Sequence, residues 1–189
     1  CLISASAYTP NAVTVSAGTV IFENNYVNDC EMAGLELQNQ SDDFTEAIVR
    51  NNSFRNCGTG IKTGGTVFLR AERNDIQGGS EGVYLNGDTT ADFGGGSVGL
   101  KIDPDPCNPP SSTGLNIIKG YTTGNSFINA TGNALTVKAE NNEWNHTTVA
   151  DVIANDVSSR VDVDPLAAPG TAGTQPPLGP QCPYGPNCE

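Results

Sequence analysis

The sequence holds few of the residues that most enzymes and nucleic-acid-binding proteins depend on. It has one histidine, one tryptophan and one methionine, and 9 Lys and Arg against 21 Asp and Glu. The formal charge of −12 makes nucleic acid and anionic membrane surfaces poor partners, because both are themselves anionic. No apolar run approaches the ~20 residues that span a bilayer, and no signal-like segment opens the chain. Aromatic residues are only 6%, which disfavours a stacking platform for sugars.

Zinc-binding patterns are also absent. No two of the six cysteines are spaced as Cys-x-x-Cys, and His146 has no cysteine nearby. Six cysteines in a chain of this size are typical of an exported protein with disulfides. We therefore expect an extracellular or cell-surface protein, with no transmembrane segment and no nucleic-acid partner.

What the sequence does contain is a repeat. An asparagine is followed two places on by an apolar residue, and eight places on by a glycine and a second apolar residue. The clearest copies begin at Asn52 and Asn74, and related copies begin at Asn25, Asn125 and Asn142. Spacings of 27 and 22 residues separate the first three asparagines, and a period of this size indicates a solenoid.

The chemistry of each unit selects the kind of solenoid. Leucine-rich and helical repeat patterns are missing, whereas short β-rich runs such as 66–69 and 83–85 are separated by Asn and Gly. These two residues tolerate the left-handed backbone that corners require. The sequence therefore predicts an all-β fold, a parallel β-helix of about five to seven coils over residues 1–166.

The repeat resembles a known family. Its Asn-x-Phe-x-x-Cys/Gly-x-x-Gly-Ile units, the Asp92-Phe93-Gly94-Gly95-Gly96 run and the Asn141-Asn142-Glu143-Trp144 segment are similar to right-handed parallel β-helix repeat proteins of bacterial surfaces and envelopes. The resemblance covers about residues 12–166 and implies a right-handed, secreted or cell-surface β-helix. It implies no single activity, because the fold hosts lyases, hydrolases, adhesins and structural proteins alike.

Three segments depart from the regular repeat. Residues 100–123 include four prolines within 104–110, which cannot join a central ladder, so we expect a protruding loop there. Residues 148–155 predict a short helix that caps the last coil, with Thr148 as its N-cap. Residues 167–189 form a Pro/Gly-rich tail that serves either as a tethered strap or as a flexible linker.

For the repeated asparagines and cysteines we prefer a structural role to a functional one. We expect Asn25, Asn52, Asn74, Asn125 and Asn142 to form a hydrogen-bonded ladder at one corner. Cys30 and Cys57 each follow a ladder asparagine by five residues, so they stack in adjacent coils, either as a disulfide, which we favour, or as free thiols.

The remaining cysteines carry weaker predictions. Cys182 and Cys188 are close enough in sequence for a local disulfide, which leaves Cys1 and Cys107 by elimination. Cys1 is alternatively a lipid-bearing terminus or the point where a longer chain was cut.

Candidates for chemistry are sparse. Relatives of this fold include lyases that use an acidic cation cluster with Arg or Lys, and the nearest match here is Arg70 with Asp88 or Asp92. No cofactor is required by any motif, but Asp103 and Asp105 can supply oxygens to a Ca²⁺.

We therefore expect a non-catalytic structural or interaction β-helix that stacks head to tail into filaments. The alternative is a polysaccharide lyase or hydrolase, or a glycan-binding adhesin, that binds extracellular polysaccharide on the β-helix surface.

Overall fold

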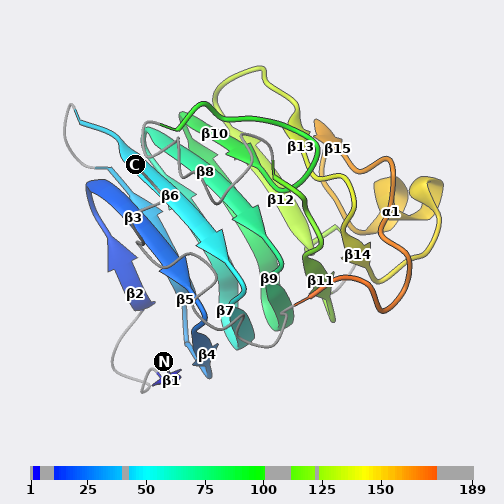
Figure 1. The fold of residues 1–189 in the computed structure, drawn as a ribbon, viewed down its shortest axis with the longest axis horizontal. Coiled ribbons are helices and arrows are strands. Elements are labelled where there is room, and N and C mark those ends of the chain that lie inside the picture. Colours follow the sequence, from blue (N-terminus) through cyan, green and yellow to red (C-terminus); the bar gives the residue numbers. More distant parts are fainter. Residues whose placement is uncertain (1, 5–10, 40–42, 101–111, 122–123, 174–189) are drawn as a thin grey trace, which may run out of the picture.

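A computed structural model describes residues 2–4, 11–39, 43–100, 112–121 and 124–173. The chain forms a parallel β-solenoid of about five turns with one short C-terminal helix (Figure 1), which confirms the predicted all-β solenoid. The strands are β1 (Leu2–Ser4), β2 (Asn11–Val15), β3 (Gly18–Glu23), β4 (Tyr26–Asn28), β5 (Ala33–Gln38), β6 (Thr45–Arg50), β7 (Ser53–Gly64), β8 (Val67–Glu72), β9 (Asp75–Gly87), β10 (Thr89–Asp92), β11 (Ile117–Lys119), β12 (Phe127–Thr131), β13 (Val137–Lys138), β14 (Glu143–Trp144) and β15 (Val161–Asp162). The helix is α1 (Val149–Asn155).

Each coil contributes to three parallel rows of strands. The first row runs β1-β4-β7-β9-β11-β14, and the second row stacks β2, β5, the later halves of β7 and β9, and β12. These two rows belong to one sheet, because β7 and β9 continue through the corner between them. The third row is a separate sheet, β3-β6-β8-β10-β13-β15.

Alternation along the strands builds the core. In the second row Val13, Leu35, Ile61, Val83 and Phe127 stand in register on successive coils. The last four are buried in the core, and Val13 is partly buried against it. Fully burying such a side chain contributes about 1.5–3 kcal/mol. The apolar residues of the sequence repeat are therefore the inward column of the solenoid.

The corners are made by left-handed residues stacked on one another. Asn24, Asn51, Arg73, Leu115 and Asn141 occupy the corner between the third and first rows, with φ between 54° and 59°. Asparagine tolerates this conformation well, whereas Arg73 and Leu115 are held in it by the coils on either side. The corner therefore keeps its left-handed backbone in the two coils where Arg73 or Leu115 stands in place of asparagine.

The prediction of a protruding loop over residues 100–123 is wrong for residues 117–119, which form a strand. Ile117–Lys119 forms β11, which pairs with β9 on one side and β14 on the other. Asn116 and Ile118 are buried and restore the asparagine-x-apolar unit. Proline excludes only the segment that contains it from a ladder, and those prolines lie in 101–111, outside the described residues.

The C-terminal end is covered by α1 and by the chain that follows β15. Thr148 is the N-cap, as predicted, and its Oγ1 accepts from the backbone N–H of Asp151 at 3.2 Å. Val152 faces the core and is fully buried. Beyond β15, the N–H of Ala167 donates to Asn142 O at 3.0 Å, so the start of the tail lies along the last coil. Within the described residues, no helix is long and apolar enough to cross a membrane.

Candidate functional site

The asparagine column is a continuous hydrogen-bonded ladder. From coil to coil, the side-chain Nδ2 of each asparagine donates to Oδ1 of the next, at 2.9–3.1 Å. The same Oδ1 also accepts a backbone N–H from the coil before it, at 2.8–3.0 Å. The members in order are Asn25, Asn52, Asn74, Asn116 and Asn142. Four of these were expected from the sequence.

Asn116 takes the place that the sequence analysis gave to Asn125. The reason is that Asn125 precedes β12, a second-row strand, and its carbonyl accepts from the N–H of Gly82 at 3.1 Å. Asn125-x-Phe127 therefore has the same sequence pattern as the asparagine-x-apolar units of the ladder but lies at the start of a second-row strand. Asn116-x-Ile118 is the true unit, and its signal was hidden by the assignment of 100–123 to a loop.

Cys30 and Cys57 are joined by a disulfide, with their Cα atoms 4.2 Å apart, which confirms the favoured pairing. Both cysteines are buried. The disulfide therefore links two neighbouring coils across a separation of 27 residues. Cys1, Cys107, Cys182 and Cys188 lie outside the described residues, as do Asp103 and Asp105.

The catalytic candidates are only partly brought together. Arg70 and Asp92 are register neighbours on β8 and β10, and both are buried. Asp88 is exposed at a corner, where Asn133 Nδ2 lies 3.5 Å from its Oδ1. The structure thus separates Asp88 from the other two residues.

Asp92 is occupied by the backbone around it. One carboxylate oxygen accepts from the N–H groups of Gly94 at 2.8 Å and Gly96 at 3.1 Å, and the other accepts from the N–H of Ser112 at 3.0 Å. A carboxylate with both oxygens engaged this way holds a turn and anchors the returning chain.

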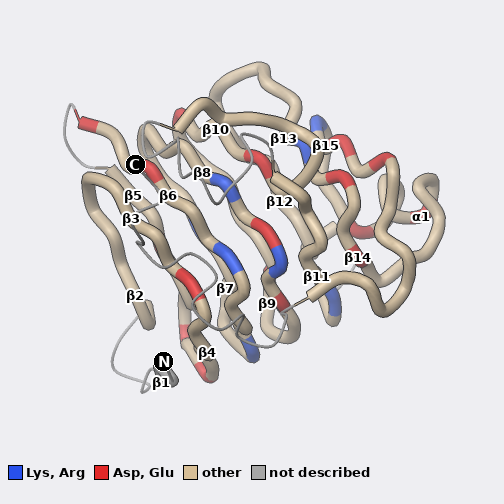
Figure 2. The backbone as a smooth tube through the Cα atoms, viewed as in Figure 1, with Lys and Arg blue, Asp and Glu red and all other residues tan. Residues whose placement is uncertain are grey.

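Arg70 lies beside a second anchor. Its Nη2 is 3.8 Å from Glu72 Oε2, which in turn accepts from the N–H and Oγ1 of Thr113 at 3.1 and 3.0 Å. Figure 2 shows positive and negative residues side by side across this outer face of the third row. The charges here fix the segment from Ser112 to Gly114 onto the solenoid.

The last coils continue this charged face. Lys138 Nζ contacts Asp162 Oδ2 at 2.6 Å and Glu140 Oε1 at 2.9 Å, and these carboxylates raise the pKa of the lysine. The hydrogen bond from Lys138 lowers the pKa of Asp162 in return. These side chains are ion-paired at the surface. Among the described residues, no three His, Cys, Asp or Glu side chains are grouped so as to hold a metal ion.

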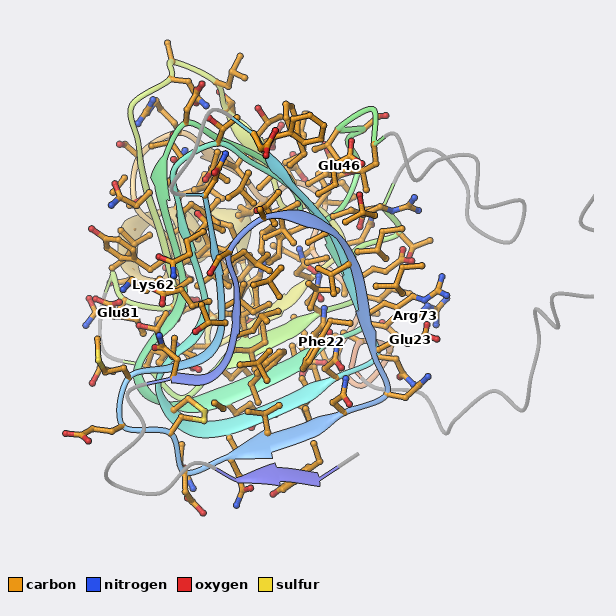
Figure 3. The ribbon with its side chains drawn as sticks, turned by 90° about the vertical axis from the view of Figure 1, so that its left-hand side faces the viewer. Phe22, Glu23, Glu46, Lys62, Arg73 and Glu81 are labelled. Carbon is orange, nitrogen blue, oxygen red and sulfur yellow. A yellow bond between two sulfur atoms is a disulfide. The ribbon has the colours of Figure 1, made fainter. Side chains whose placement is uncertain are left out.

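A different face carries an open groove that sequence analysis did not find. The groove has a volume of about 560 Å³ and crosses β5, β7 and β9 near the corner between the first and second rows. It is lined by Glu31, Met32, Ala33, Gly58, Thr59, Lys62, Ser80, Glu81, Tyr84 and Asn86. In Figure 3, Lys62 and Glu81 lie together on this side, while Glu23 and Arg73 lie on the opposite side.

The groove has an uneven charge distribution. Lys62 Nζ is paired with Glu36 Oε1 at 2.9 Å, so its charge is compensated. Among the described residues, Glu81 Oε2 accepts a hydrogen bond only from the hydroxyl of Thr59, at 3.1 Å, and Glu31 is exposed. Negative charge is therefore in excess. A usable sequence signal was the residue after each Gly-apolar pair, because Glu36, Lys62 and Tyr84 stand there and point outward.

Comparison with protein-family models, with curated proteins and with solved structures finds no match to this chain. The fold itself defines the class, a parallel β-solenoid protein with disulfide-linked coils.

Proposed function

We propose that the protein is a non-catalytic structural or interaction module of the cell exterior. The observation that carries this proposal is that the catalytic candidates have structural roles. Both oxygens of Asp92 accept hydrogen bonds from backbone N–H groups, and Arg70 is buried beside Glu72. A base or electrophile needs a free atom within reach of substrate. Both oxygens of Asp92 are already hydrogen-bonded, and Arg70 is too deeply buried to be reached.

An exterior location, at the cell surface or secreted, is supported by the Cys30–Cys57 disulfide, because disulfides persist best in an oxidising compartment. A membrane anchor through Cys1 stays a prediction.

The absence of turnover is the first expected result. The purified chain should leave a panel of acidic and neutral polysaccharides intact, with and without Ca²⁺, when unsaturated products and reducing ends are followed. Arg70→Lys is the informative variant, because it keeps the charge in a buried position. Cleavage by the native chain that disappears in Arg70→Lys would instead support a lyase or hydrolase.

As an interaction module, the protein is proposed to bind a partner at the outer edge of β2 and β3, called here the N-terminal edge. Within the described residues no strand pairs with the outer edge of β2 or β3, and Ile21 on β3 is 41% exposed. Gly18 and Asn24 donate their N–H groups toward β6, so by alternation the N–H of Ile21 points to the open edge. Unpaired edges of this kind add strands from another molecule.

We therefore expect the 189-residue chain to self-associate end to end in a concentration-dependent way. The covered C-terminal end favours a pair of N-terminal edges over an open filament, since an isologous contact closes on itself. Analytical ultracentrifugation should show the dissociation constant rising at least about tenfold for Ile21→Lys. Ile128→Lys, on the paired strand β12, is the matched control. A native chain that stays monomeric at all concentrations contradicts end-to-end association, and long filaments in electron micrographs would favour head-to-tail stacking instead.

A further inference from the structure

We propose that the groove across β5, β7 and β9 binds a linear glycan carrying free amino groups, such as a chain of hexosamine units. The proposal rests on the assigned role as an interaction module and names its partner. The charge, the polar groups and the strand pairing of the groove support it.

The negative charge of the groove favours a positively charged ligand. Glu31 and Glu81 contribute two carboxylates, whereas Lys62 is neutralised by Glu36. A uronate-containing polysaccharide would bring further negative charge next to these groups and be repelled. An ammonium group fits, because it can reach the Glu81 oxygen that does not accept from Thr59.

The polar groups of the groove match a polyhydroxylated chain. Hydroxyls of Thr59, Ser80 and Tyr84 and the amide of Asn86 line it, all able to exchange hydrogen bonds with sugar hydroxyls. The half-buried ring of Tyr84 offers a flat apolar surface beside them. The floor of the groove is low because Ala33 carries only a methyl group and Gly58 has no side chain.

The coil spacing gives these groups a regular arrangement. Ala33, Thr59 and Glu81 stand in register on three successive coils, as do Glu36, Lys62 and Tyr84. Neighbouring strands lie about 4.8 Å apart, which is close to the length of one pyranose unit. A linear glycan laid along the solenoid axis can therefore meet one coil with each sugar.

Strand pairing argues against an extended basic peptide as the occupant. Peptides bind to sheets mainly by adding a strand at an open edge. Here β5, β7 and β9 pair with one another, and β2 and β12 pair on the two outer sides, so the groove offers no free ladder. Side chains alone must recognise the ligand, and this favours a chain whose own repeating groups make the contacts.

The direct test is calorimetric titration of the native chain with a linear glucosamine oligomer. Its fully N-acetylated form, equal in length but uncharged, and an oligogalacturonate are run in parallel. We expect the glucosamine oligomer to bind at least about tenfold more tightly than the acetylated one, with no binding of the oligogalacturonate. Added salt should weaken the interaction, because the charges are at the surface.

Variants then place the site. Glu81→Gln and Glu31→Gln should each weaken binding of the glucosamine oligomer, by about tenfold for the half-buried Glu81. Glu23→Gln, on the opposite side of the solenoid in Figure 3, should leave it unchanged. If Glu81→Gln fails to fold, the comparison of free and acetylated oligomers on the native chain still decides the proposal.

Three outcomes would overturn it. They are equal affinity for the acetylated oligomer, unchanged affinity in both groove variants, and binding of an oligolysine peptide as tight as that of the glucosamine oligomer. Cleavage of the bound oligomer has a different meaning. It would overturn the non-catalytic function while leaving the groove as the binding site.

Discussion

Replacing Asn74 with alanine is expected to lower the free energy of unfolding by about 3–5 kcal/mol. Asn74 lies in the middle of the ladder and is fully buried. Its Nδ2 donates to Val49 O at 2.8 Å and to Asn116 Oδ1 at 2.9 Å, and its Oδ1 accepts from both the backbone N and the side chain of Asn52 at 3.0 Å. Alanine removes all four of these hydrogen bonds, and a buried group left without a partner costs about 1–3 kcal/mol. The backbone N–H of Asn52 loses its acceptor, whereas Asn116 Oδ1 and Asn52 Nδ2 each keep other partners.

Urea denaturation followed by circular dichroism measures this effect. The matched control is Asn86→Ala, at an exposed asparagine on the same coil, which should change stability by less than about 0.5 kcal/mol. A loss below about 1 kcal/mol for Asn74→Ala would mean that the neighbouring coils close the gap with other donors, and that the ladder is not a main source of stability.

Removing the coil-to-coil disulfide is the second large change. The free energy of unfolding of the double variant Cys30→Ala/Cys57→Ala is expected to be about 3.5 kcal/mol lower than that of the oxidised native chain. A cross-link that closes 27 residues removes about that much entropy from the unfolded ensemble. The double variant is preferable to a reducing agent, because reduction would also act on the other four cysteines.

The single variants Cys30→Ala and Cys57→Ala complete the experiment. Each should lose nearly as much stability as the double variant, because either substitution opens the same cross-link. A double variant as stable as the native chain would show that the two cysteines contribute only packing. The result also bears on location, since a strong dependence on the disulfide favours an oxidising exterior.

The sequence determined the solenoid because the fold's constraints recur at fixed spacing. Each coil needs an inward apolar column and corner residues that tolerate left-handed backbone, so the same residues return every 22–27 positions, except between Asn74 and Asn116, which are 42 apart. The Asn25–Asn52–Asn74 part of the ladder and the stacking of Cys30 on Cys57 follow from that spacing. The spacing allowed either a disulfide or free thiols at the two cysteines, and the structure has the disulfide. Thr148 as a helix N-cap was equally local, since capping involves residues three apart.

Only the tertiary structure decided what depends on contacts between distant coils. Asn116 replaced Asn125 because pairing with β9 and β14, and not the local motif, fixes which strand occupies the corner. Asp92 and Arg70 are poor catalytic candidates because the chain returns twenty or more residues later, where Ser112 bonds Asp92 and Thr113 bonds Glu72, the residue beside Arg70. The groove arises where short side chains on one coil meet long ones on the next, a relation set by register between coils.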